Sequence, residues 1–100
     1  MQQHLVLKPL GESLSVSVTG TARSLPSLPA NALKSLIQIQ AGSIRAAFYD
    51  TTSLSSSVGY LMSGGVDYEV EGWDFMNMMR MISVSGTATI CILYSGEGQP

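Results

Sequence analysis

The sequence predicts an all-β protein: an antiparallel β-sandwich with a jelly-roll-like arrangement, or a small barrel, of about seven or eight strands. Three observations favour this class. Several short segments alternate between apolar and polar residues, which is the pattern of a half-buried strand. Gly, Pro and Ser separate these segments at short intervals. No segment carries a convincing helix pattern, and 100 residues correspond to one domain spanning residues 1–100.

The first strands are expected within the N-terminal third. Residues 13–19 alternate strictly, with Leu or Val on one face and Ser or Thr on the other. The run before them, residues 4–10, is rich in β-forming residues, and Pro9 places it at a sheet edge or a strand end. Residues 23–35 contain two prolines, so we expect extended chain on the surface there.

The middle of the chain favours a hairpin followed by a long loop. One strand begins with residues 36–39, Gly42 marks a tight turn, and a second strand covers residues 44–49. Residues 51–66 carry no charge and are rich in Ser and Gly. We expect a long loop here, with a short strand at residues 60–62.

Two segments in the last third of the chain again alternate in polarity. In residues 66–71 the apolar positions expected to face inward are Val66, Tyr68 and Val70, and the outward positions are Asp67, Glu69 and Glu71. Residues 87–95 alternate again and stop at Gly96. Two strands are therefore expected in this part of the chain.

Between these two strands lies a segment whose structure is ambiguous. Residues 71–86, EGWDFMNMMRMISVSG, contain four methionines within six residues. A helical stripe is present at Phe75, Met78, Met79 and Ile82, but the segment is short and its end resembles a strand that runs into a turn. We predict a turn at residues 73–77 and a strand over residues 78–84, with a helix as the alternative.

The composition indicates a protein that contacts other proteins. Charged residues make up 12% of the chain, against about 25% in a typical soluble domain, and the net charge is only −2. Such a surface opposes self-association weakly, so a homo-oligomer is expected. The five basic residues form no stripe, which argues against nucleic acid. No apolar run suits a membrane span and no signal peptide is recognisable, so we expect synthesis in the cytoplasm.

Catalytic and metal-binding patterns are not evident, and we expect neither an enzyme nor a cofactor. His4 and Cys91 are the single histidine and the single cysteine, and Cys91 is expected to be a small buried apolar residue. Pairing the two as nucleophile and base would need a third, orienting group that nothing marks. The acidic cluster is Asp67, Glu69, Glu71 and Asp74. It suits a solvated strand face or contact with a basic neighbour better than calcium, which prefers loop ligands.

Seven residues are candidates for an interface. Five come from the uncharged segment and two from later positions: Leu54, Val58, Tyr60, Leu61, Met62, Trp73 and Arg80. Tyr60 and Trp73 lie at predicted turns and could form a binding platform. Arg80 shares its predicted strand face with apolar residues only, so we expect a carboxylate partner, from the acidic cluster or from a neighbouring subunit.

The order of several short motifs resembles that of a group of tailed-phage and prophage virion proteins of this size. The motifs lie within residues 21–96: Leu28-Pro29, Ile37-Gln38, Ile44-Arg45, Gly59 to Leu61, Met79 to Ile82 and Thr87 to Tyr94. The resemblance implies a β-sandwich that decorates or cements the phage head and binds the major capsid protein or other virion proteins. It also implies location in the virion, no catalytic residue, and a strand at residues 79–82. Residues 51–57 depart from the pattern. The alternative is a tail or fibre module that binds a host glycan or another virion protein.

Overall fold

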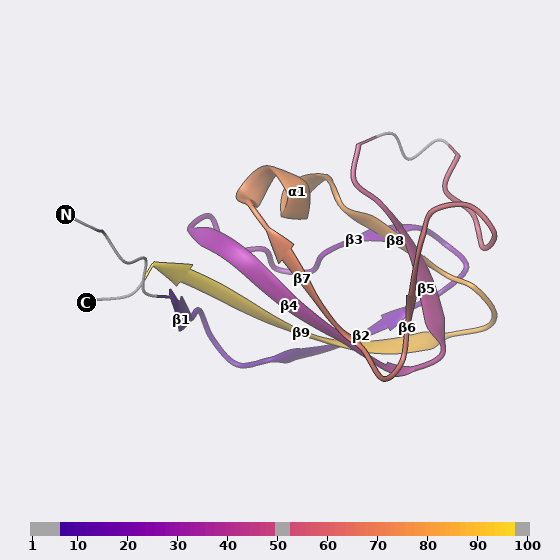
Figure 1. Cartoon of the computed structure of the whole chain (residues 1–100), viewed down its shortest axis with the longest axis horizontal. Helices are drawn as coiled ribbons and strands as arrows, with labels where there is room; N and C mark the ends of the chain where they lie inside the picture. Colours follow the sequence, from indigo (N-terminus) through magenta and orange to yellow (C-terminus); the bar gives the residue numbers. More distant parts are fainter. Residues whose placement is uncertain (1–6, 50–52, 98–100) are drawn as a thin grey trace.

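The computed structural model describes residues 7–49 and 53–97, and this part of the chain is an antiparallel β-sandwich with one short helix (Figure 1). Its elements are β1 (Leu7–Pro9), β2 (Leu14–Val18), β3 (Arg23–Ser24), β4 (Ala32–Ala41), β5 (Ser43–Ala47), β6 (Tyr60–Ser63), β7 (Asp67–Glu71), α1 (Trp73–Met78), β8 (Arg80–Ser83) and β9 (Ala88–Glu97). The predicted all-β class is confirmed, and the structure is a sandwich and not a barrel.

The strand order is that of a jelly roll. In one sheet the order is β2–β9–β4–β7, with β1 pairing beside β2 along the same edge of β9. In the other sheet the order is β3–β8–β5–β6. All strand pairs are antiparallel, and this arrangement of eight strands in two sheets is the jelly-roll pattern.

The core lies between the sheets, where the alternating apolar residues of both sheets meet. The long strands β4 and β9 contribute a large share of it, including the fully buried Ile37, Ile90 and Ile92. The prediction for residues 13–19 is confirmed, because the apolar residues of β2 face the core while its serines are exposed. Val66 is 52% exposed, contrary to the prediction, because it precedes β7 and follows the Gly64-Gly65 turn.

The predicted hairpin at Gly42 is wrong. Strands β4 and β5 follow one another directly, but β4 pairs with β7 and β9 whereas β5 pairs with β6 and β8. The chain crosses from one sheet to the other at Gly42, which has φ +77°. A Cβ atom there would lie 3.1 Å from the Cβ of Ala88, so glycine suits this crossing.

The methionine-rich segment, residues 71–86, contains both a short helix and a strand. The predicted turn at residues 73–77 is in fact the six-residue helix α1, which connects β7 in one sheet with β8 in the other. Met76 is fully buried beneath the helix, and Met79 and Met81 enter the core from the β8 side. The predicted strand is therefore confirmed, although it is shorter than residues 78–84. Within the described residues, no helix is long and apolar enough to cross a membrane.

Candidate protein interface

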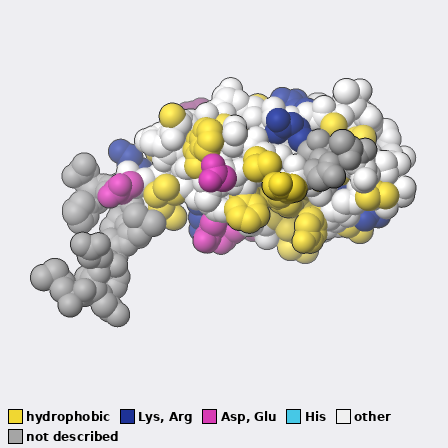
Figure 2. Space-filling model, turned by 90° about the horizontal axis from the view of Figure 1, so that it is seen from above, with side chains coloured by type: hydrophobic (Ala, Val, Ile, Leu, Met, Phe, Trp, Pro, Cys, Tyr) yellow, Lys and Arg dark blue, Asp and Glu magenta, His cyan; other side chains and the backbone are white. Residues whose placement is uncertain are grey.

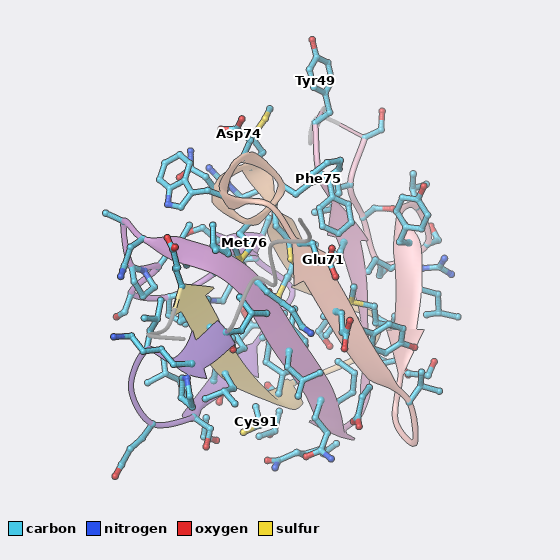
Figure 3. The ribbon with its side chains drawn as sticks, turned by 60° about the vertical axis from the view of Figure 1, so that its left-hand side comes forward. Tyr49, Glu71, Asp74, Phe75, Met76 and Cys91 are labelled. Atoms are coloured by element: carbon cyan, nitrogen blue, oxygen red, sulfur yellow. The ribbon has the colours of Figure 1, made fainter. Side chains whose placement is uncertain are left out.

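Five apolar side chains gather at the end of the sandwich that carries α1. We call this the aromatic surface and define it as Phe48, Tyr49, Tyr60, Phe75 and Met78. Two follow β5, one begins β6 and two lie on α1, so three elements build it. Figure 2 shows hydrophobic side chains clustered on this face, and Figure 3 shows Tyr49 and Phe75 beside the helix.

Phe48 holds the aromatic surface together. Its ring lies 5.9 Å from the ring of Tyr60 and 6.0 Å from that of Phe75, in both cases at an interplanar angle of 64°. Edge-to-face packing of this kind is favourable beyond the area that it buries. Phe48 also packs partly against the core, so it anchors the two more exposed rings to the sandwich.

The remaining rings are open to solvent. Tyr49 is 85%, Tyr60 72% and Phe75 59% exposed. One groove is lined by Phe48, Phe75 and Met78 together with Tyr49 and Asp74. A contiguous exposed apolar patch with a polar rim is typical of a site that binds another molecule.

A second groove adjoins the first and has an acidic wall. Its lining combines three aromatic residues with residues of β7: Phe48, Tyr60, Phe75, Glu69, Val70 and Glu71. The aromatic surface therefore meets the outer row of β7 (Figure 3). A partner that covers both would place apolar groups on the rings and basic groups at the rim.

The interface residues predicted within the uncharged segment, residues 51–66, lie in different environments. Tyr60 belongs to the aromatic surface, whereas Leu61 and Val58 are exposed but line neither of its grooves. Leu54 is half-buried and lies against Gly59, where a Cβ atom would come within 2.8 Å of it. Met62 packs in the core and has almost no surface to offer a partner. The short strand predicted at residues 60–62 is confirmed as β6.

Local hydrogen bonds order the loop that precedes β6. Ser55 and Val58 form an antiparallel bridge, with N–O distances of 3.1 and 3.3 Å. The Ser55 hydroxyl accepts a hydrogen bond from the Ser57 amide at 3.2 Å. Residues 55–58 therefore form a small closed turn. Residues 51 and 52 of the predicted loop lie outside the described residues.

Trp73 does not form a platform with Tyr60. It lies at the start of α1, lines neither groove of the aromatic surface, and donates its indole N–H to the Pro29 carbonyl at 3.2 Å. This bond fixes the ring against the chain between β3 and β4. The sequence prediction missed Phe48, Tyr49, Phe75 and Met78, although Phe75 and Met78 are three residues apart, the spacing that places two side chains on one helix face.

Arg80 faces outward and pairs with no carboxylate of the described residues. Because Met81 and Ser83 fill the inner face of β8, Arg80 emerges on the outer face. Its Nη1 donates to the carbonyls of Asn77 at 3.1 Å and Met79 at 2.9 Å. In the described part of the chain the ion pair present is Lys34–Glu69, so an intramolecular partner for Arg80 is not found there.

The acidic cluster and Cys91 both lie on outer surfaces. Asp67, Glu69 and Glu71 point away from the core, as predicted, and Glu69 pairs with Lys34 at 3.2 Å. Among the described residues, no three His, Cys, Asp or Glu side chains converge as a metal site would require. The expectation that Cys91 is buried in the core is wrong, because it occupies an outward position of β9 and is half-buried. His4 lies outside the described residues.

Comparisons with known proteins identify no relative by sequence. No protein-family model matches the chain, and no curated protein is similar to it. A subunit of Bacillus endospore appendages, a family of disulfide-linked pili, matches in structure with a TM-score of 0.48 and 11% identity, over 99% of this chain and 93% of that one. A dTDP-4-dehydrorhamnose 3,5-epimerase from Bacillus anthracis matches with a TM-score of 0.35 and 19% identity, over 90% of this chain and 54% of that enzyme. These likenesses carry no argument about function.

Proposed function

We propose that this protein is a noncatalytic structural component of a tailed-phage particle, a decoration subunit that docks on the major capsid protein. The observation that carries the proposal is the aromatic surface, where the exposed rings of Tyr60 and Phe75 both pack against the half-buried ring of Phe48. Aromatic residues are enriched in the centre of protein interfaces and contribute much of their binding energy.

Two further features support docking on a protein. The charged fraction is 12%, so little of the surface resists desolvation on contact. The resemblance in motif order to small virion proteins favours a particle as the place of assembly. The jelly-roll fold itself serves many functions and does not distinguish among them.

The experiment is a co-sedimentation assay of the purified chain with phage heads that lack the decoration protein. Wild type should pellet with the heads, and Tyr60→Ser/Phe75→Ser should bind at least about 30-fold more weakly, the loss expected for hot-spot aromatics. The matched control is Leu61→Ser, which removes an exposed apolar side chain outside the aromatic surface and should bind like wild type.

Two outcomes would overturn the proposal. Failure of the wild-type chain to bind heads would exclude the decoration role. Equal binding by the double variant and wild type would exclude the aromatic surface as the docking site. The second candidate is a glycan-binding module on a tail or fibre, which the exposed rings beside Glu69 and Glu71 also favour. In that case wild type should bind host cells and not heads.

A further inference from the structure

A groove at the β2–β3 edge contains two of the chain's five basic residues. Arg23 and Arg80 line it together with the hydroxyl-bearing Ser17, Thr19, Thr21 and Ser24. We call this the arginine groove. Both arginines are half-buried, and neither pairs with a carboxylate from the described part of the chain.

Backbone carbonyls hold both guanidinium groups in place. Arg23 donates from Nη1 to the Ser17 carbonyl at 3.2 Å and from Nε to the Ser24 carbonyl at 3.4 Å. Within the described part of the chain, Arg80 donates from Nη1 to the two carbonyls described above. Each arginine has five N–H donors, so both keep donors that can bind a carboxylate from outside.

The complementary charges lie at the other edge of the same molecule. We call Asp67, Glu69 and Glu71 the acidic edge, since all three are exposed on the outer face of β7. With Asp74 they are four of the chain's seven acidic residues. Glu69 pairs with Lys34, which leaves Asp67 and Glu71 without an ion-pair partner among the described residues.

The topology places the two features on opposite sides of the sandwich. Strands β6 and β7 end their sheets on one side, where the Ser63 amide donates to the Tyr68 hydroxyl at 2.9 Å. Strands β2 and β3 lie on the other side, where the Ser83 amide donates to the Thr19 carbonyl at 2.8 Å. One molecule therefore cannot satisfy its own arginine groove with its own acidic edge.

We propose that copies of this chain associate side by side, with the acidic edge of one copy bound in the arginine groove of the next. The charges are complementary, and they are concentrated in a chain that otherwise carries very few. Because the contact joins two different surfaces, it continues from copy to copy and forms rows or rings. The contact rests on the proposed function and deepens it, since decoration subunits would lie side by side on a head. It uses none of the five residues of the aromatic surface, although Glu69 and Glu71 also line the groove beside that surface.

The test is a charge swap read by analytical ultracentrifugation. Wild type at low salt should form species larger than dimers, and these should dissociate when the salt is raised from about 0.05 M to about 0.5 M. Arg23→Glu/Arg80→Glu alone and Asp67→Lys/Glu71→Lys alone should each associate at least about 100-fold more weakly, because like charges then oppose each other. An equimolar mixture of the two variants should associate again, because each supplies the surface that the other needs.

The matched control is Glu12→Lys/Glu97→Lys, which raises the net charge as Asp67→Lys/Glu71→Lys does, at exposed positions outside both surfaces. It should associate like wild type. If the arginine variant fails to fold, Thr21→Glu/Ser24→Glu places carboxylates in the same groove, keeps both arginines, and should also weaken association.

Three results would overturn the proposal: a monomeric wild type at low salt, association that either swap leaves unchanged, or a mixture no more associated than its components. Head binding by the same variants separates this proposal from the proposed function. Arg23→Glu/Arg80→Glu, whose positions line neither groove of the aromatic surface, should still reach single sites on the head. The aromatic variant should fail to bind heads and still self-associate.

Discussion

The hydroxyl of Tyr94 donates a 2.6 Å hydrogen bond to the carbonyl of Pro26, although 68 residues separate the two in the chain. Tyr94 lies on β9, in the centre of one sheet, and Pro26 follows β3 of the other sheet. Burial raises the pKa of Tyr94 to about 12, and the nearby Arg23 opposes this effect. The hydrogen bond from Tyr94 to Pro26 fixes the segment that connects β3 to β4.

The first prediction is that stability falls in alkali through Tyr94. The folded pKa of about 12 exceeds the ordinary value of 10.0, so between these values the unfolded state loses a proton that the folded state keeps. The free energy of unfolding should therefore fall as the pH rises through this window, and the effect should be absent below it. Urea unfolding at about pH 9 and about pH 11 measures the fall.

Tyr94→Phe is the matching variant. At neutral pH it should lower the free energy of unfolding by about 0.5–1.5 kcal/mol, because the Pro26 carbonyl loses its donor. Between pH 10.0 and about 12 its stability should decline less steeply than that of wild type. Parallel pH profiles for the two proteins would show that another group causes the alkaline loss.

The second prediction concerns Gly42, where the chain crosses between the sheets. Gly42→Ala combines a positive φ with a contact to the Ala88 backbone, whose Cα lies 3.2 Å from the new Cβ position. Gly65→Ala is the control, since Gly65 also has a positive φ but no atom within 4 Å of such a Cβ. Both should lose about 1–2 kcal/mol from backbone strain. Thermal unfolding should show a larger loss for Gly42→Ala, and equal losses would argue against tight packing on Ala88.

Alternation predicted the strands because each strand has one face on the core and one on the outside. In β2, β7 and β9 the apolar period of two follows directly from that geometry. The partner of a strand is not encoded in this pattern. A glycine between two strands, such as Gly42, suits a hairpin and a crossing between sheets equally well, and the pairings of β4 and β5 with other strands distinguish the two.

The candidate interface was less predictable because it depends on tertiary structure. Tyr60 was identified from its position near a turn, but its neighbours Phe48 and Phe75 come from segments far apart in the sequence. The six-residue helix that exposes Phe75 is also too short for its periodicity to exclude a turn. For Arg80 the sequence predicted a carboxylate partner within the chain or on a neighbouring subunit. Among the described residues its Nη1 binds two backbone carbonyls, and a partner on another subunit stays a prediction.

The third prediction compares the stability contributions of the buried and exposed faces of α1. Met76→Ala should lower the free energy of unfolding by about 2–5 kcal/mol, because it leaves a cavity where a fully buried side chain was. Phe75→Ala, next to it, removes a largely exposed ring and should cost much less. Chemical unfolding of both variants gives the comparison. Comparable losses would indicate that Phe75 stabilises the fold and is not free to bind a partner.

The final prediction is that Arg80 contributes little to the stability of the isolated chain. Arg80→Met removes donors from the carbonyls of Asn77 and Met79, which should cost about 0.5–1.5 kcal/mol. Breaking a buried ion pair would instead cost roughly 3–5 kcal/mol. Arg80→Lys is the control, since it keeps the charge and one donor-bearing group at the same position. Urea unfolding distinguishes the two ranges. A loss in the higher range would show that a carboxylate binds Arg80 within the same chain and would leave the arginine groove without its free donors.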